Sequence, residues 1–147
     1  MSPNGLDLLF LEVNSLRDSV EFYRDKLGFD LLSLAEDAEP PMATLRAGAL
    51  RVTLVEQLLT MARRGRGVHF LFGVPDVDAY YERLREGGVD VAPPADEGWG
   101  GRFVTVEDPD RYRLFFVAWH AEGRRSPDPG KPFAGSLDDL GANYILA

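Results

Sequence analysis

The chain repeats one order of secondary-structure signals, and this repeat limits the fold more than any other feature of the sequence. The first half predicts a strand, a helix and three more strands, at 8–13, 16–27, 29–34, 43–46 and 50–56. The second half predicts the same order, at 68–74, 77–86, 89–91, 103–106 and 112–117. Ser15 and Asp76 are both good N-caps, and glycine ends both helices. Because such self-similarity is the signature of duplicated units, the sequence predicts an α+β fold of two βαβββ modules.

Length and composition limit the organisation and the partners. The 147 residues fit one domain, 1–147, with modules at 7–56 and 68–117 and a C-terminal tail at 118–147. The absence of cysteine excludes disulfides and thiolate metal sites and suits a reducing cytosol. Apolar runs are too short to span a bilayer, and a net charge of -8 disfavours nucleic acid. We therefore expect a cytoplasmic protein whose partner is a small molecule, with no nucleic acid and no membrane.

Two segments resemble the signatures of a known family. Residues 19–29 have the pattern S-x-x-F-Y-x-x-x-L-G-F, and residues 108–111 form a D-P-D-G-like turn with Arg111 in the glycine place. The loop at 98–102 is similar to one in the drug-binding branch of that family. Over about residues 7–117 the chain resembles the vicinal oxygen chelate superfamily of glyoxalases, bleomycin resistance proteins and dioxygenases. The resemblance implies that the two modules form a cupped mixed sheet with a cavity.

The resemblance also implies where a divalent metal would be bound. Metal-dependent members take ligands from the first and last strands of each module, and these positions are Leu8, Thr53, His69 and Phe115 here. Only His69 could coordinate a metal well. We therefore expect no metal, no other cofactor and no catalytic residue. The alternatives are a metal-dependent or His69-assisted lyase, isomerase or dioxygenase, or a half-buried His69 that is hydrogen-bonded to a neighbouring strand or loop.

The same alignment indicates which residues would line the cavity, because alternate residues of a strand share a face. The expected ligand-binding residues are Leu8, Phe10, Glu12, Arg51, Thr53, His69, Leu71, Trp99, Arg113 and Phe115. Their centre is apolar and aromatic, which suits a planar or amphipathic organic molecule. Glu12 favours a neutral or cationic ligand over an anionic one. The other interpretation is that the aromatic side chains close a solid core.

Together these features favour a binding function. We predict non-catalytic binding or sequestration of a small organic molecule, as in antibiotic resistance. A regulatory or structural module that lost its ligand is the third possibility. The apolar segment 144–146 and the family's habit of completing crevices across subunits predict a homodimer.

Overall fold

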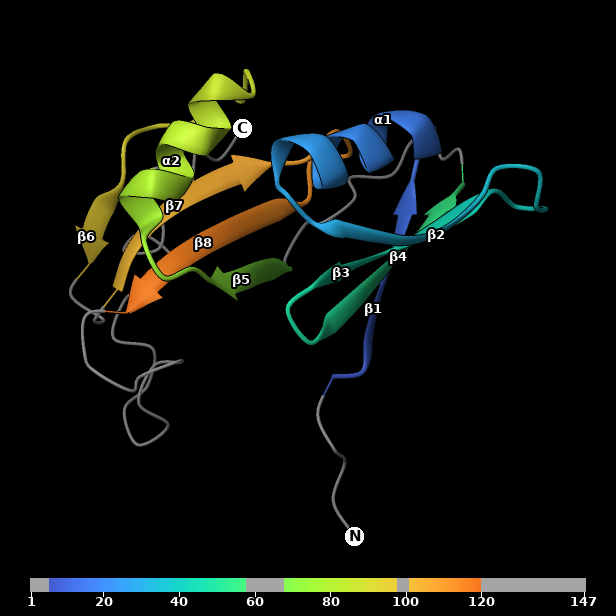
Figure 1. Cartoon of the computed structure of the whole chain (residues 1–147), viewed down its shortest axis with the longest axis horizontal. Helices are drawn as coiled ribbons and strands as arrows, with labels where there is room; N and C mark the ends of the chain where they lie inside the picture. The colour runs from blue at the N-terminus through green and yellow to red at the C-terminus, as the bar shows by residue number, and fades with distance from the viewer. Residues whose placement is uncertain (1–5, 58–67, 98–100, 120–147) are drawn as a thin grey trace, which may run out of the picture. The chain divides into compact units, whose positions relative to one another are not determined.

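The computed structural model describes residues 6–57, 68–97 and 101–119. The chain forms two compact units, and each is described by itself. The first contains residues 1–64 together with 108–111, and the second contains 65–107 and 112–147. Each unit has one four-stranded sheet, and the elements are labelled in Figure 1. Trp99 and the predicted C-terminal tail beyond residue 119 lie outside the described residues.

The first unit follows the predicted order of strand, helix and three strands. Its elements are β1 (Leu8–Val13), α1 (Leu16–Val20), the π-helix η1 (Glu21–Lys26), β2 (Asp30–Ala35), β3 (Met42–Ala47) and β4 (Leu50–Glu56). The strand order is β1-β4-β3-β2, with β1 parallel to β4 and the other neighbours antiparallel. Within this sheet β1 and β2 are therefore the edge strands.

The first helix begins as predicted but does not continue as a regular α-helix. The Ser15 hydroxyl accepts a hydrogen bond from the Asp18 amide at 3.2 Å, which confirms the N-cap. From Glu21 onward the helix has π geometry, and the Leu27 amide donates to the Phe22 carbonyl five residues earlier. The expected single α-helix over 16–27 is therefore wrong in its second half. The wider turn accommodates Phe22 and Tyr23, two adjacent aromatic side chains that are both buried and pack edge to face.

Two buried aspartates anchor the turn at 108–111 within the first unit. The Tyr23 hydroxyl donates to Asp108 Oδ2 at 2.7 Å. Asp110 accepts from the Asn14 amide at 2.9 Å and from the Ser19 hydroxyl at 3.4 Å. Both aspartates are buried, Asp108 at 4% and Asp110 at 7% exposure. Buried carboxylates need hydrogen-bond donors, and three donors from outside the turn hold these two aspartates. They are Asn14, which precedes α1, Ser19 of α1 and Tyr23 of η1.

The turn itself has the predicted form. The Asp108 side chain accepts from the Asp110 amide at 2.9 Å, and its carbonyl accepts from the Arg111 amide at 3.0 Å. Arg111 has a φ of 70°, in the left-handed region that usually favours glycine. This conformation explains why the pattern that the segment resembles has glycine at this position.

The second unit repeats the topology of the first. Its elements are β5 (His69–Gly73), α2 (Val77–Glu86), β6 (Ala95–Glu97), β7 (Gly101–Glu107) and β8 (Arg113–Trp119). The strand order is β5-β8-β7-β6, with β5 parallel to β8. The prediction of two βαβββ modules is thus confirmed, and both sheets are mixed.

One strand of the second unit was predicted at the wrong place. The short strand expected at 89–91 is absent from the described structure, and the second strand of the unit is β6. The Val89 amide donates to the Leu84 carbonyl at 2.9 Å, so this segment completes the C-terminus of α2. The Val89 amide is thus used by the helix before the sheet begins.

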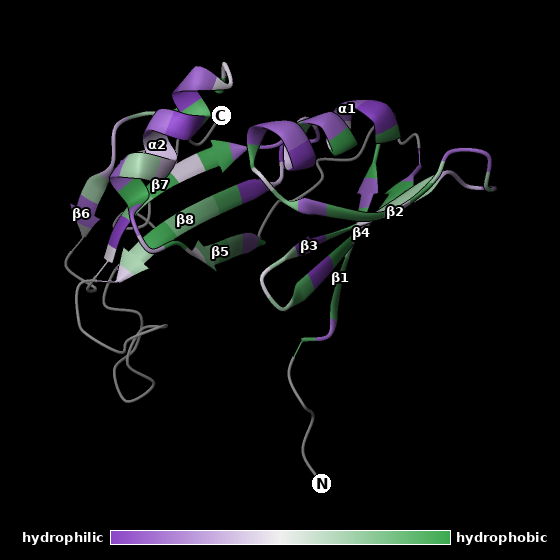
Figure 2. Ribbon diagram, viewed as in Figure 1, coloured by the Kyte–Doolittle hydropathy of each residue, from purple (hydrophilic) through white to green (hydrophobic). Residues whose placement is uncertain are grey.

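Each sheet has a buried strand next to its parallel edge strand. Figure 2 shows hydrophobic residues along much of β4 and β8. Four consecutive residues of each are buried, 52–55 in β4 and 114–117 in β8. In the second unit α2 packs on β7 and β8, and the Tyr80 ring lies 4.5 Å from that of Phe116. No helix among the described residues is long and apolar enough to cross a membrane.

Candidate functional site

The predicted ligand-binding residues of the first unit share one face of its sheet. In the parallel pair of β1 and β4, Leu8 lies opposite Arg51, Phe10 opposite Thr53, and Glu12 opposite Val55. Residues opposite one another in neighbouring strands point to the same side of the sheet. We call these six residues the Phe10 face: Leu8, Phe10, Glu12, Arg51, Thr53 and Val55. The intervening residues of β1 and β4 form the other face, on which α1 packs.

The Phe10 face exposes two apolar side chains at the edge strand β1. Phe10 is 57% exposed and Leu8 is 42% exposed, whereas Leu11 and Val13 on the other face are buried. The neighbouring Thr53 is 8% exposed, and its hydroxyl lies 2.9 Å from that of Thr44, with which it shares a hydrogen bond. Phe10 thus lies opposite Thr53, whose hydroxyl is already hydrogen-bonded to that of Thr44.

The predicted residues of the second unit also pair across their sheet. His69 lies opposite Arg113, and Leu71 lies opposite Phe115. Leu71 is 37% exposed, but Phe115 has no exposed surface. The Phe115 ring packs 5.6 Å from the His69 ring and 5.7 Å from the Phe103 ring. Phe115 therefore supports this face from within the core and would not touch a ligand directly in this conformation.

The imidazole of His69 is in a setting that disfavours its charged form. Partial burial lowers the pKa of His69, and the neighbouring charge of Arg113 lowers it further. The Arg113 guanidinium is mostly buried and lies 3.9 Å from a Glu107 carboxylate oxygen. Both effects favour the neutral form of the His69 imidazole.

The residues at the four inferred metal positions do not fit a metal ion. Leu8 and Phe115 have no donor atoms, and the Thr53 hydroxyl is engaged with Thr44. His69 alone offers a suitable nitrogen, whereas a divalent metal of this class needs three or four donors. Within residues 6–57, 68–97 and 101–119 there is also no group of three or more histidine, cysteine, aspartate or glutamate residues that could hold one. We derive no chemistry through a metal.

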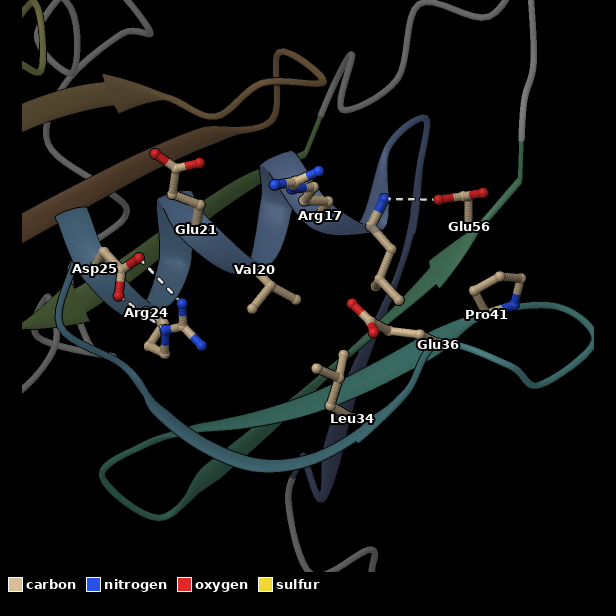
Figure 3. A pocket seen from close by; sticks show the side chains of 10 residues that line it. Arg17, Val20, Glu21, Arg24, Asp25, Leu34, Glu36, Pro41 and Glu56 are labelled. Carbon is tan, nitrogen blue, oxygen red and sulfur yellow. Dashed lines mark hydrogen bonds and ion pairs between the residues drawn. The ribbon is translucent and has the colours of Figure 1, made fainter.

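A pocket that the sequence analysis missed lies on the helix side of the first sheet. It has a volume of about 500 Å³ and is shown in Figure 3. We call it the helix-edge groove, and its lining residues are Leu16, Arg17, Val20, Glu21, Arg24, Asp25, Leu34, Glu36, Pro41 and Glu56. The signal in the sequence was the spacing of Arg17, Glu21 and Arg24, which places three charges along one side of the helix.

Two of the charged lining residues, Arg24 and Asp25, pair with each other within the helix. The Arg24 guanidinium donates to Asp25 at 2.8 Å and 3.1 Å. This hydrogen bonding lowers the pKa of the Asp25 carboxyl and raises the pKa of Arg24. At the other end of the groove the Glu56 carboxylate accepts from the Leu16 amide at 2.9 Å, which satisfies an amide at the helix N-terminus.

Comparison with known proteins identifies the family. A model of the Glyoxalase/Bleomycin resistance protein/Dioxygenase superfamily matches residues 5–116. The chain therefore belongs to this superfamily, as the helix and turn motifs predicted. It is 29% identical over 111 residues to the uncharacterized protein YraH of Bacillus subtilis (strain 168), over 68% of this chain and 87% of YraH.

Two solved structures share the fold and some sequence. A glyoxalase/bleomycin resistance protein/dioxygenase from Nocardioides is 26% identical with a TM-score of 0.69, over 86% of this chain and 90% of that protein. TnmS3, an antibiotic binding protein from Streptomyces sp. CB03234, is 27% identical with a TM-score of 0.68, over 81% of this chain and 98% of TnmS3. Antibiotic-binding proteins thus occur among the relatives of this chain.

Proposed function

We propose that the protein binds and sequesters a small planar or amphipathic organic molecule without transforming it. The observation that carries this proposal is Phe10, which is 57% exposed beside the exposed Leu8 on a sheet face of this superfamily's fold. Covering apolar surface contributes roughly 25 cal/mol per Å² before the costs of immobilisation are subtracted. A flat ligand stacked on Phe10 would gain this contribution. The similarity to TnmS3, an antibiotic binding protein, supports the same function.

The charges of the Phe10 face suggest how the ligand would be oriented. Glu12 lies at one end of the face and Arg51 at the other, opposite Leu8. Leu8 and Glu12 are separated by about 13 Å of strand. A neutral ligand fits over Phe10, and a cationic group is favoured only at the Glu12 end. We therefore propose a ligand that is neutral or carries its cation at one end.

We favour binding over catalysis because the inferred metal positions hold few groups that could coordinate a metal or transfer a proton. His69 is the single candidate among the four inferred metal positions, and a lone imidazole supports only modest acid-base chemistry. The competing function is a His69-assisted or metal-dependent lyase, isomerase or dioxygenase. It requires that the ligand be consumed, whereas sequestration leaves the ligand unchanged.

The proposal is tested by a thermal-shift screen with planar aromatic compounds, followed by titration of the compounds that raise the melting temperature. We expect Phe10→Ala to weaken binding by roughly 1–3 kcal/mol, as the loss of an aromatic anchor often does. Because Phe10 is exposed, the same variant should change the free energy of unfolding by less than about 0.5 kcal/mol. Leu32→Ala, which removes another exposed side chain of the first sheet, serves as the control. Unchanged binding by Phe10→Ala would contradict the proposal.

The location and assembly remain parts of this proposal. We propose that the protein acts in the cytosol as a homodimer. The segment 144–146 that predicts the dimer lies outside the described residues. Light scattering at micromolar concentration tests the dimer, and a monomeric mass would contradict it.

A further inference from the structure

We propose that the helix-edge groove is a second binding site, which takes a small organic ammonium ion with an apolar body. The groove belongs entirely to the first unit. It lies on the helix side of the sheet, and the Phe10 face lies on the other side. The inference is therefore independent of the function proposed above.

The groove exists because the helix covers only part of its sheet face. In the antiparallel register Leu34 lies opposite Ala43, which in turn lies opposite Leu54. These three residues share the helix side of the sheet, yet Ala43 and Leu54 are 1% and 0% exposed while Leu34 is 44% exposed. The helix α1 packs mainly on β3 and β4. The edge strand β2 therefore extends past the helix and leaves an apolar wall uncovered.

The walls of the groove can hold a compact apolar body. Leu16 and Val20 of α1 form the helix wall and are nearly buried, at 3% and 5% exposure. Figure 3 shows the side chains of Val20 and Leu34 pointing toward one another across the groove. A volume of about 500 Å³ is within the usual range of small-molecule pockets. An aliphatic or aromatic group placed between these walls would cover Leu34.

The charges around the groove select a cation. Four carboxylates line it, those of Glu21, Asp25, Glu36 and Glu56, against the two guanidiniums of Arg17 and Arg24. The Asp25 carboxylate is paired with Arg24, and the Glu56 carboxylate accepts from the Leu16 amide. The carboxylates of Glu21 and Glu36 then remain against Arg17.

Glu36 is the carboxylate best placed to receive the cation. It follows Leu34 by two residues, and Figure 3 shows its carboxylate on the β2 side of the groove, turned toward the helix. An ammonium group at Glu36 would leave its apolar body between Val20 and Leu34. An anion at the same place would meet the excess of negative charge, which the net charge of -8 reinforces.

The test uses three probes that share one apolar body and differ in charge: phenethylammonium, 2-phenylethanol and 3-phenylpropionate. Each is titrated into the full-length ¹⁵N-labelled protein and followed by amide chemical shifts. We expect saturable shifts at Val20, Leu34 and Glu36, with phenethylammonium bound most tightly and 3-phenylpropionate least tightly. Glu36→Gln should weaken phenethylammonium about two- to fivefold, the effect of an accessible ion pair, and leave 2-phenylethanol unchanged. Leu34→Ser should weaken both alike.

Matched variants separate this site from the Phe10 face. Glu86→Gln removes an exposed carboxylate of α2 and should alter none of the titrations. Phe10→Ala should leave the groove titration intact. If Phe10→Ala abolishes the shifts, the probe binds the Phe10 face, and the groove inference fails while the proposed function stands. The inference is also overturned if no probe gives a saturable shift in the groove, or if Glu36→Gln leaves the preference for the cation unchanged.

Discussion

Removal of the Tyr23 hydroxyl, a change of a single oxygen atom, should destabilise the protein strongly. Tyr23 is 1% exposed, and its hydroxyl donates at 2.7 Å to the Asp108 carboxylate, which is 4% exposed. Tyr23→Phe keeps the ring and its edge-to-face contacts with Phe22 and Phe29 but leaves the Asp108 oxygen without this donor. Hydrogen bonds to charged groups contribute about 1.5–3 kcal/mol, and an abandoned buried acceptor costs a similar amount. We therefore expect a loss of about 1.5–3 kcal/mol in the free energy of unfolding.

This loss is measured by urea denaturation followed by far-ultraviolet circular dichroism. For a chain of this length the melting temperature should fall by about 3–12 °C. The control is Tyr81→Phe, because Tyr81 is only half-buried and its contact with Arg85 involves the ring. That change should stay within about 0.5 kcal/mol of the wild type. If Tyr23→Phe is as stable as the control, the buried anchor at 108–111 does not contribute as we infer.

Two further perturbations test the same structure. Arg111→Gly should stabilise the protein by roughly 0.5–1 kcal/mol, because glycine adopts the φ of 70° without steric cost, and a lower urea midpoint would contradict this. His69 has a pKa below its ordinary value of 6.5, so the unfolded chain takes up the proton more readily than the folded protein. The stability due to neutral His69 should therefore be complete above pH 6.5 and fall as the pH drops through the folded pKa. His69→Gln should show a smaller loss of stability between pH 8 and pH 5 than the wild type, and an equal loss would refute the assignment.

The sequence was sufficient for those parts of the fold that depend on local chemistry. Ser15 and Asp76 cap their helices as predicted, since a capping side chain bonds to amides only two or three residues away. The period-two pattern also predicted that Phe10 and Thr53 share a sheet face, as do Leu71 and Phe115, and the register places each pair opposite one another. The strand expected at 89–91 failed because the Val89 amide is taken by the helix C-terminus, and an apolar pattern does not reveal that competition.

Which residues of the candidate site are exposed depends on tertiary packing, and the sequence pattern of polar and apolar residues does not reveal that packing. Phe10 and Phe115 were both expected to line the cavity, yet one is 57% exposed and the other is fully buried. The difference follows from the strand order, since β1 is an edge strand and β8 is an interior one. The helix-edge groove was missed for the same reason. It depends on where α1 lies across the sheet, which leaves Leu34 exposed while Ala43 is covered.

The central claim is that the protein holds a small molecule without transforming it. The most direct measurement uses a ligand identified by the thermal-shift screen. The protein is incubated for a long time with a modest molar excess of this ligand, and the recovered ligand is analysed by mass spectrometry. We predict that the ligand is recovered unchanged and that about one molecule remains with each chain after the excess is removed. Conversion of the ligand to a product of different mass, faster than in protein-free buffer and lost in His69→Ala, would contradict the account and establish an enzyme.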